Sequence, residues 1–403
     1  MNQRDMRPPF AALGGTIPPE LEKLPTPCYL LDEAALTRNA EILGGLAQRT
    51  GCKVLLAQKA FSNYDCYPLL APHLAGTEAS GLFEARLGAE EMPGKEVHVF
   101  CAAYRADEMD ELVQYADHIV FNSPAQLAKF GPAAKAAGKS VGLRINPECS
   151  TQDGHAIYDP CAPGSRLGTT RAQWNAAVAA NPALPNLLDG LHFHTLCEQD
   201  SDALATTLDA VAQKFGDLLP RMQWLNFGGG HHITRPGYDI ATLERCITRA
   251  QQDWGVTVYL EPGEACALNA GFLLSRVLDV VQNGDTTIAI LDASAACHMP
   301  DVIEMPYRPP LFAAAEPGEK PCTVRLAGPT CLAGDVIGDY GVDTVPSVGD
   351  LLVFGDMAIY TTCKNNTFNG MPLPAIFARA ASGTTRSIVS FGYEDFKYRL
   401  GKR

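Results

Sequence analysis

The chain has 403 residues, of which 46% are hydrophobic and 19% are charged, and its formal net charge at pH 7 is −13. This composition is typical of a folded globular protein and excludes a disordered or collagen-like chain. The acidic excess disfavours nucleic acid as a partner, because phosphates would be repelled, and it suits a small cationic ligand. The thirteen cysteines are scattered without CxxC pairs, so we expect reduced thiols, no metal site and a cytoplasmic protein.

Residues 1–24 are rich in Pro and Gly and show no periodicity, so we expect them to form a poorly ordered lead-in. They lack the apolar core of a signal peptide, and no stretch of the chain approaches the ~18 apolar residues of a membrane span. Neither export nor membrane association is therefore expected. Residues 25–45 are expected to contribute a strand, PCYLLD from residue 27, to a second domain and then to begin the first helix.

Residues 46–272 alternate short apolar runs with longer stretches of helical period, the pattern of repeated strand–helix units around a parallel sheet. The second of the strand-like runs is the weakest, since Gly76 and Glu78 are poor strand residues. Eight such units close a (β/α)8 TIM-like barrel. The eight runs are KVLLAQ at 53, GTEAS at 76, VHVFC at 97, HIVFN at 118, VGLRIN at 141, GLHFH at 190, QWLNF at 223 and TVYLE at 257.

Residues 273–403 change to β-rich runs separated by Pro and Gly turns. This change predicts a second, antiparallel β domain at the C-terminus. The expected strands are SRVLDVVQ at 275, TTIAILDAS at 286, CTVRLAG at 322, DLLVF at 350 and SIVSF at 387.

Residues with reactive or binding side chains fall at or just after the C-terminal ends of the barrel runs. In such barrels this edge builds the active site, whereas residues with purely structural roles would be scattered over both ends. The residues are Lys59, Ser80, Asn122, Arg144, His194, Gly228, Gly229, Gly230 and Glu261.

Lys59 ends the first run, where apolar surroundings favour the neutral amine that condenses with an aldehyde. Gly228–Gly230 follow the seventh run, where backbone N–H groups can approach a phosphate. Glu261 follows the eighth run and could pair with the protonated nitrogen of a pyridine ring. Taken singly, each also fits a structural role, as a surface lysine, a flexible turn or a salt-bridge partner.

His194 could lie against a flat ring, while His192 would point to the same side of the strand but deeper. Cys197, three residues after His194, could reach the phosphate. A barrel histidine is also commonly a satisfied core residue. Together with the lysine, the glycines and the glutamate, these residues predict a site for pyridoxal 5′-phosphate (PLP).

This set of residues resembles the fold-type III PLP decarboxylases, the family of eukaryotic ornithine, bacterial diaminopimelate and biosynthetic arginine decarboxylases, whose barrel is similar to that of alanine racemase. The resemblance runs from about Pro25 to the C-terminus. It implies that Lys59 forms an imine with the cofactor and that His194 stacks on the ring. It also implies that the glycines bind the phosphate and that Glu261 pairs with the ring nitrogen.

Two C-terminal segments also resemble the family: GPTCLAGD at 328–335 is similar to its cysteine motif, and DMAIYTTCKNNTFNG at 356–370 to its tyrosine and FNG segment. The resemblance implies that Cys331 protonates the substrate carbon after CO2 leaves and that Tyr360 contacts the phosphate. In the family the cysteine motif reaches the cofactor of the partner subunit. We therefore expect a homodimer with shared active sites.

The chain departs from the ornithine-type enzymes in having EPGEA at 261–265 instead of EPGR, and Leu332 instead of aspartate after the cysteine. The strings HFHTLCE, CHMPDVIEMPYRP and FNGMPLPAI resemble the carboxynorspermidine/carboxyspermidine decarboxylase branch, whose product is norspermidine or spermidine. Such a substrate carries several ammonium groups that need carboxylates. The acids expected to meet them are Glu264, Asp292, Asp301 and Asp335.

Three other functions remain open. A diaminopimelate or other basic amino-acid decarboxylase is the nearest, although the acidic EPGEA segment disfavours binding of a distal carboxylate. A racemase would need a base on each face of the cofactor. A noncatalytic regulator would be expected to have lost the lysine or the phosphate glycines, and both are present.

Overall fold

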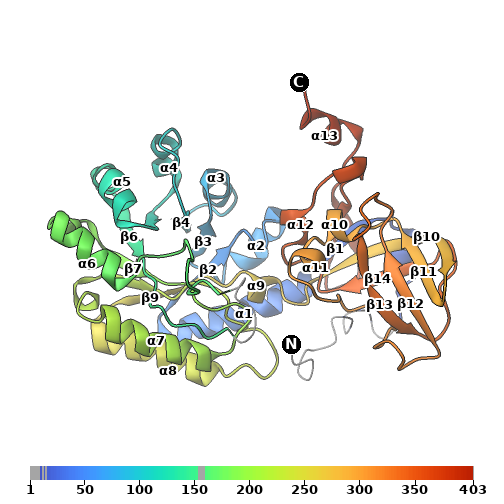
Figure 1. The fold of residues 1–403 in the computed structure, drawn as a ribbon, viewed down its shortest axis with the longest axis horizontal. Coiled ribbons are helices and arrows are strands. Elements are labelled where there is room, and N and C mark those ends of the chain that lie inside the picture. Colours follow the sequence, from blue (N-terminus) through green and yellow to red (C-terminus); the bar gives the residue numbers. More distant parts are fainter. Residues whose placement is uncertain (1–9, 11–12, 14–15, 153–158, 403) are drawn as a thin grey trace. The chain divides into compact units, whose positions relative to one another are not determined.

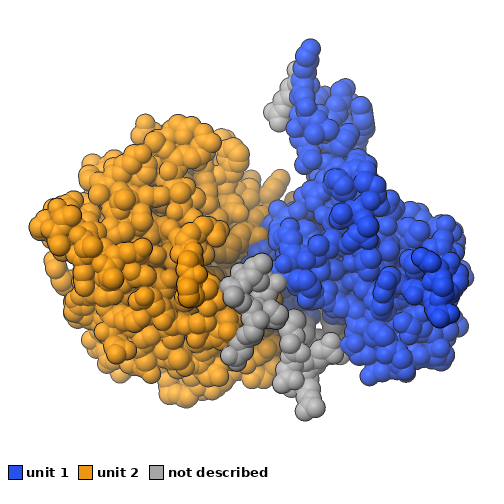
Figure 2. All heavy atoms as spheres, viewed as in Figure 1, with its two compact units in different colours: residues 1–37, 267–403 blue, residues 38–266 orange. Residues whose placement is uncertain are grey.

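The structure is a computed structural model that describes residues 10, 13, 16–152 and 159–402. The chain forms two compact units, which are coloured separately in Figure 2. The barrel unit comprises residues 38–266, and the sheet unit comprises residues 1–37 and 267–403. Among the described residues, no helix has both the length and the apolar character needed to cross a lipid bilayer.

The barrel unit contains a closed ring of eight parallel strands, as predicted, in which each strand pairs with the next along the chain and the last pairs with the first. The weakest predicted strand, β3, is present and all four of its residues are buried. Its polar residues therefore lie inside the protein. The strands are β2 (Lys53–Ala57), β3 (Gly76–Ala79), β4 (Glu96–Phe100), β5 (His118–Phe121), β6 (Ser140–Arg144), β7 (Gly190–His192), β8 (Trp224–Asn226) and β9 (Thr257–Leu260).

Helices cover the outside of the ring, and α7 and α8 lie side by side there (Figure 1). Helix α8 shows why such a helix packs on the barrel: its buried residues recur at helical spacing and form one apolar stripe. They are Leu243, Cys246, Ile247 and Ala250. The helices are α1 (Glu33–Thr50), α2 (Tyr67–Leu70), α3 (Leu82–Glu91), α4 (Met109–Tyr115), α5 (Pro124–Ala136), α6 (Arg171–Ala180), α7 (Ser201–Phe215), α8 (Ile240–Trp254) and α9 (Glu264–Ala267).

Trp224 fills much of the barrel interior, where it packs with Leu55, Val120 and Tyr259. Space for the indole comes from glycines on the two preceding strands. A Cβ atom at Gly190 would lie 2.0 Å from the indole, and one at Gly142 would lie 2.3 Å from it. The large indole fills the space that the two glycines leave, so the barrel interior reaches normal packing density.

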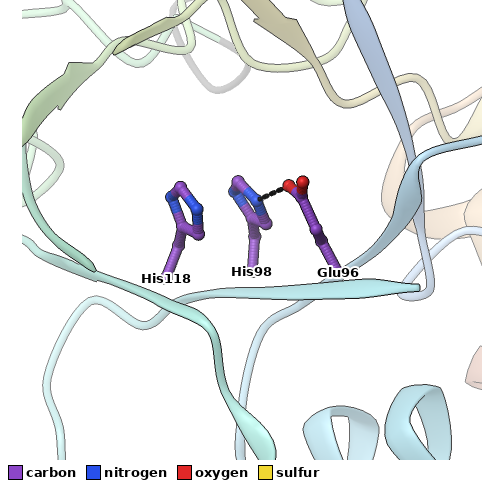
Figure 3. Close-up of side chains that lie close together, drawn as sticks. All are labelled: Glu96, His98 and His118. Carbon is purple, nitrogen blue, oxygen red and sulfur yellow. Dashed lines mark hydrogen bonds and ion pairs between the residues drawn. The ribbon is translucent and has the colours of Figure 1, made fainter. Parts of the chain in front are cut away.

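The N-terminal end of the barrel carries a polar cluster of Glu96, His98 and His118 (Figure 3). Glu96 accepts hydrogen bonds from His98 Nε2 at 3.0 Å and Tyr259 Oη at 3.0 Å, and it also pairs with Lys53. The imidazoles of His98 and His118 stack with ring centroids 3.8 Å apart. Although burial opposes ionisation, His98 and Lys53 lower the pKa of Glu96 to about 2. Glu96 is thus an ionised carboxylate with its own donors.

The sheet unit is built around strand β1, whose five residues are all buried between β10 and β15. The order of strands is β13-β12-β11-β10-β1-β15-β16, and β14 also pairs with β10. The strands are β1 (Cys28–Asp32), β10 (Gly271–Asn283), β11 (Thr286–Leu291), β12 (Cys322–Ala327), β13 (Val336–Val342), β14 (Leu351–Gly355), β15 (Ala375–Arg379) and β16 (Thr385–Val389). The short helices of the sheet unit are α10 (Ala295–His298), α11 (Asp301–Glu304), α12 (Thr361–Lys364) and α13 (Tyr393–Tyr398).

This sheet is mixed, not antiparallel throughout. Most pairs are antiparallel as expected, but β1 pairs with β15, and β11 with β12, in parallel. Parallel neighbours need a connection that returns along the sheet, and the segments that join these strands are long enough to do so. The boundaries of the units also differ slightly from expectation, because α1 continues to Thr50 and β10 already begins at Gly271.

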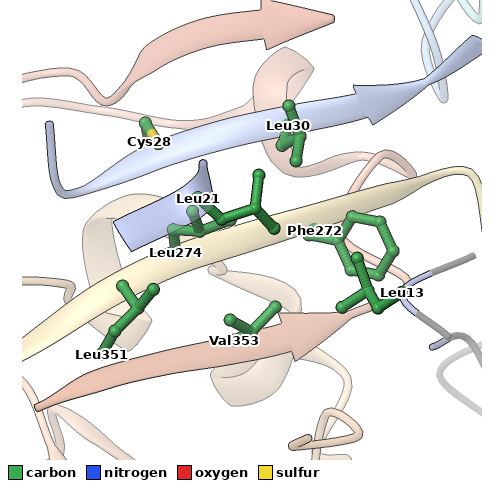
Figure 4. Packing of buried hydrophobic residues seen from close by; sticks show 8 residues of the cluster. All are labelled: Leu13, Leu21, Cys28, Leu30, Phe272, Leu274, Leu351 and Val353. Atoms are coloured by element: carbon green, nitrogen blue, oxygen red, sulfur yellow. The ribbon is translucent and has the colours of Figure 1, made fainter. Parts of the chain in front are cut away.

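The described part of residues 1–24 belongs to the core of the sheet unit, contrary to the expectation of a poorly ordered lead-in. Leu13 and Leu21 pack against strand residues that include Phe272 and Val353 (Figure 4). Leu21 lies in a short 3-10 helix, Leu21–Lys23, and is fully buried. Burial of a leucine contributes about 1.5–3 kcal/mol, which is enough to hold an otherwise irregular segment in place.

Candidate active site

Lys59 lies in the turn that follows β2, at the C-terminal end of the barrel, and is partly buried. Its charge acts on several groups from other strands, because it contributes to lowering the pKa of Glu78 and Glu261 and of His192 and His194. The charge of the predicted lysine therefore acts on two buried carboxylates and two imidazoles of the same barrel. We refer to this end of the barrel as the rim.

Glu261 follows β9 and is only 4% exposed. It accepts a hydrogen bond from Asn226 Nδ2 at 2.5 Å, and His192 Nε2 lies 3.1 Å from its other oxygen. Burial raises the pKa of Glu261, but His192 and Lys59 outweigh this effect and lower it to about 2. Burial lowers the pKa of His192, and its contact with Glu261 acts in the opposite direction. His192 is more deeply buried than His194.

Glu78, on β3, is a second buried carboxylate that sequence reasoning missed. It is 1% exposed, and its Oε2 atom has no hydrogen-bond partner. Burial raises its pKa to about 8, although Lys59 acts in the opposite direction. The signal was present in the sequence, because a glutamate within a strand that is buried on both sides cannot be solvated. It was interpreted only as a weak strand former.

Arg144 ends β6 and is 5% exposed. One of its terminal nitrogens donates to the carbonyl of His194 at 3.0 Å, and its guanidinium lies 4.5 Å from the ring centroid of Phe100. Burial lowers its pKa to about 10, so it stays charged at neutral pH. The predicted arginine thus brings a fixed cation into the apolar part of the rim.

His194 is held in one orientation by the glycine turn, because Gly229 N–H donates to its Nδ1 at 2.9 Å. Burial and the charge of Lys59 lower the pKa of His194 well below its usual value. The imidazole is therefore neutral and carries its proton on Nε2. A neutral ring fixed beside the lysine is suited to lie against another flat ring, as expected for this residue.

The Gly228–Gly230 turn can only be made by glycine. At Gly230, φ is 83°, and a Cβ atom would lie 2.0 Å from the carbonyl oxygen of Leu196. At Gly229, a Cβ atom would lie 2.5 Å from the carbonyl oxygen of Glu261. Backbone of this kind, free of side chains, is suited to contact a phosphate.

Three loops of the rim meet beside this turn. His232 lies in the loop after β8, Glu198 in the loop after β7 and Glu264 at the start of α9, and their ligand-type atoms lie within 4.8 Å of one another. His232 Nε2 is 3.2 Å from Glu264 Oε2. Burial opposes ionisation of His232, but Glu264 and Glu198 raise its pKa. Sequence reasoning missed His232, because a histidine two residues after a glycine turn has no distinctive pattern.

The side chains of the rim have the properties needed to bind PLP. Glu78 Oε2 and His192 Nδ1 are two buried polar atoms of the described rim residues that lack hydrogen-bond partners. Such atoms are rare in folded proteins and indicate that a polar group is bound. An amine, a neutral ring, an ionised carboxylate and a glycine turn match the aldehyde, pyridine and phosphate of the cofactor.

Three other predicted rim residues have local contacts. Ser80 is exposed at the end of β3, where its N–H donates to Glu84 Oε2 at 2.6 Å. Cys197 is partly buried, and burial raises its pKa to about 12, so it is a neutral thiol. Asn122 accepts from Gly168 N–H at 2.7 Å and orders the loop after β6.

In the sheet unit, Cys331 is exposed in a loop that Asn369 holds, since Cys331 N–H donates to Asn369 Oδ1 at 2.8 Å. The two motifs predicted from sequence, the cysteine motif and the FNG segment, are thus in direct contact. Tyr360 precedes α12 with a left-handed φ of 59°. Leu332 and Phe368 beside them are 44% and 46% exposed.

The aspartates predicted to bind substrate have partners within the sheet unit. Asp335 is 3% exposed and accepts from Ser294 Oγ at 2.9 Å and from Thr330 Oγ1 at 2.7 Å. Asp292 accepts from Thr26 Oγ1 and Ser275 Oγ, both at 2.6 Å. These contacts are those of structural carboxylates and give no support to a substrate role for either residue.

Asp301 differs from these two. It pairs with Lys364, which also pairs with Glu304, so two carboxylates share one ammonium group. Asp301 and Glu304 therefore keep a net negative charge.

The comparisons with known proteins identify the family to which this chain is similar. A family described as "Pyridoxal-dependent decarboxylase, C-terminal sheet domain" matches residues 28–358. Carboxyaminopropylagmatine decarboxylase of Synechocystis is 44% identical over 95% of this chain and 97% of that protein. Carboxynorspermidine/carboxyspermidine decarboxylase of Campylobacter jejuni is 40% identical over 94% of this chain and 99% of that protein.

Solved structures give the same result. The crystal structure of carboxynorspermidine decarboxylase complexed with norspermidine, from Campylobacter jejuni, has a TM-score of 0.85 and 39% identity, covering 93% of this chain and all of that one. A diaminopimelate decarboxylase at 20% identity has a TM-score of 0.80, which shows the shared fold. By its matched residues, its relatives and its barrel-plus-sheet architecture, this chain belongs to the pyridoxal-dependent decarboxylase family.

Proposed function

We propose that this protein is a PLP-dependent decarboxylase that converts carboxynorspermidine or carboxyspermidine into norspermidine or spermidine and CO2. The observation that carries the proposal is the grouping around Lys59 of an ionised buried Glu261, a neutral His194 and the Gly228–Gly230 turn. Relatives named for these substrates, at 35–40% identity over nearly the whole chain, support the choice.

Bound PLP supplies an electron-withdrawing ring that accepts the electron pair left when CO2 departs. Lys59 provides the amine that holds the aldehyde. Glu261, whose pKa is about 2, stays ionised and can keep the pyridine nitrogen protonated. His194, fixed by Gly229, can lie against the ring and restrict its orientation.

The proton that replaces CO2 must come from an acid with access to the substrate carbon. We assign this role to Cys331, which is exposed on the described chain and belongs to the family's cysteine motif. Tyr360 is assigned to the phosphate. The role of Cys331 requires a homodimer, in which Cys331 acts in the active site of the partner subunit. The exposed apolar side chains of Leu332 and Phe368 support an interface around the motif, because such side chains are commonly covered by a partner.

For the cationic tail of the substrate we retain Asp301, because its carboxylate and that of Glu304 have only Lys364 between them. The net charge of −13 favours such a substrate at longer range. We also place the protein in the cytoplasm, which the thirteen cysteines, scattered without CxxC spacing, support.

Carboxyaminopropylagmatine is a second candidate substrate, because the relative named for it is 44% identical over 95% of this chain. It shares the carboxylated aminopropyl portion and differs at the far end of the chain. Decarboxylation needs the same residues in either case, so the two candidates differ only in recognition of the tail.

The experiment is to incubate purified PLP-loaded protein with carboxynorspermidine, carboxyspermidine, carboxyaminopropylagmatine and meso-diaminopimelate, one at a time, measuring CO2 and the amine product. We expect turnover of a carboxylated polyamine. Turnover of diaminopimelate alone, or exchange of the α-proton without CO2 release, would contradict the proposal.

The homodimer is tested by mixing two inactive variants, Lys59→Ala and Cys331→Ala, under conditions that exchange subunits. If active sites are shared, half of the dimers are mixed and each has one intact site, so about one quarter of wild-type activity should return. No recovery from a mixture that native mass spectrometry shows to contain mixed dimers would contradict shared sites.

A further inference from the structure

The loops beside the glycine turn are locked together by hydrogen bonds. Gln199 N–H donates to the carbonyl of Gly230 at 3.0 Å, and His232 N–H donates to that of Gln199 at 3.3 Å. Thr234 Oγ1 donates to the carbonyl of Ala265 at 2.7 Å, which ties the same loop to α9. The positions of Glu198, His232 and Glu264 around the turn are therefore fixed by backbone contacts.

His232 is the cation of this group. It is 7% exposed, and neither ring nitrogen has a hydrogen bond of good geometry, although Nε2 lies 3.2 Å from Glu264. Glu264 and Glu198 raise its pKa. The adjacent His231 is equally buried, but burial lowers its pKa to about 4. Burial thus lowers the pKa of His231, whereas the neighbouring carboxylates raise that of His232.

Two carboxylates beside an anion-binding turn are unfavourable unless a cation separates them from the anion. The ornithine-type arginine is replaced here by Glu264. Arg235, three residues after His232, already pairs with Asp200 at 2.5 Å. His232, whose Nε2 contacts Glu264 and whose Nδ1 has no hydrogen-bond partner, is the remaining cationic candidate beside the turn.

We propose that His232, paired with Glu264, is the cationic partner of the cofactor phosphate at the Gly228–Gly230 turn and takes the place of the arginine in EPGR. The inference rests on the proposed function, since it requires PLP to bind at the rim. It gives Glu264 a positioning role through His232 instead of the predicted contact with a substrate ammonium group. It also explains why an acidic residue is compatible with a phosphate site.

The first test is the dissociation constant of PLP, measured from the absorbance of the lysine-bound cofactor. Losing one charge-assisted hydrogen bond should weaken binding in His232→Gln by about tenfold or more. His118→Gln is the matched control, because this histidine also has an unpartnered buried nitrogen but lies at the other end of the barrel. Far-UV circular dichroism and thermal unfolding of both apo-proteins check that they fold.

The second test is a rescue. Glu264→Gln should weaken PLP binding, because His232 loses the partner that keeps it charged. In the His232→Gln background, Glu264→Arg should restore binding, because it returns the family's arginine to its position. The 31P resonance of bound PLP should move in His232→Gln and not in His118→Gln, which is a readout independent of activity.

The outcomes separate this inference from the proposed function. If the wild-type protein binds no PLP, both are wrong. If it binds PLP but His232→Gln changes neither the dissociation constant nor the 31P resonance, only the inference is wrong. If Glu264→Gln raises KM for the polyamine without changing PLP affinity, Glu264 contacts substrate and the inference is overturned. Loss of PLP affinity on addition of a chelator would assign the cluster to a metal ion and overturn it as well.

Discussion

Glu78 and Glu96 lie on the neighbouring strands β3 and β4, near opposite ends of one barrel, and have opposite properties. Glu96, at the N-terminal end, has Lys53, His98 and Tyr259 as donors, and its pKa is about 2. Glu78, at the rim, has an oxygen without any partner, and its pKa is about 8. The same residue type is therefore stabilised at one end and left unsatisfied at the other.

The difference shows how to distinguish a structural polar cluster from a functional one. At the N-terminal end the carboxylate of Glu96 has its own cation and donors, although Nδ1 of His98 and Nδ1 of His118 lack a hydrogen-bond partner. At the rim, burial without partners costs free energy that only a bound group can offset. The partners of a buried group, more than its type, separate the two roles.

The largest expected effect on kcat comes from comparing Lys59, in the turn after β2, with Lys53, at the start of β2. Lys59→Ala should lower kcat by about a thousandfold or more and abolish the absorbance of the lysine-bound cofactor, because the amine that holds the aldehyde is lost. Lys53→Ala, which removes the partner of Glu96, should retain both. Retained activity in Lys59→Ala would remove the rim from the mechanism.

The next comparison pairs two glutamates. Glu261→Gln should lower kcat by about a hundredfold, because the pyridine nitrogen loses its anionic partner. Glu96→Gln should leave kcat unchanged and lower the free energy of unfolding at pH 7. The pKa of Glu96 is depressed from 4.5 to about 2, so its contribution is complete above pH 4.5 and is lost as pH falls towards 2. Denaturant unfolding at several pH values checks this, and an equal loss of kcat in both variants would contradict the contrast.

A third variant tests the apolar interior between the two ends. Gly190→Ala should destabilise the protein by about 1–3 kcal/mol, because the new methyl group overlaps the indole of Trp224. The remaining folded protein should bind PLP with unchanged affinity. Gly138→Ala offers a control of a different kind, since a Cβ there meets no neighbouring atom but φ is 75°. Unaltered urea unfolding in Gly190→Ala would show that the barrel relaxes around Trp224.

The last variant concerns Glu78. Its pKa is raised from 4.5 unfolded to about 8 folded, so the folded protein holds the proton more tightly, and this contribution to stability fades as pH rises from 4.5 through 8. Glu78→Gln removes this pH-dependent loss. The variant apo-protein should exceed the wild type in free energy of unfolding at pH 8 by up to about 4 kcal/mol, with no gain near pH 4.5. An equal difference at both pH values would mean that Glu78 is ionised when buried.

Much of the fold was predictable because parallel barrel strands follow one another in sequence. Each apolar run from residue 53 to 261 corresponds to a strand, and the polar residue at its end falls on the rim. The sheet unit was harder, because β1 pairs with β15 from the other end of the chain. No local pattern reports a pairing between distant segments. Leu13 and Leu21 were missed for the same reason, since their packing partners lie on strands far along the chain.

Among the candidate site residues, too, the sequence indicated some and missed others. Lys59, Glu261 and the glycines were found because their positions after strands limit what they can do. The roles of Glu78 and His232 depend on which neighbours are absent or charged, and a sequence does not show this. Asp335 and Asp292 were predicted from the sequence to bind substrate, because they are acidic residues in or near the motifs. In the structure their carboxylate oxygens accept hydrogen bonds from serine and threonine hydroxyls.

Strand β1 has a consequence for synthesis on the ribosome. It leaves the exit tunnel before any of the barrel, yet its two neighbours, β10 and β15, belong to the last third of the chain. The barrel segment can close while β1 still has both edges open, so the nascent chain carries an apolar strand without partners until translation is nearly complete. A chain that stopped before residue 375 would keep open the edge of β1 that pairs with β15, and this edge could pair with a strand of another chain.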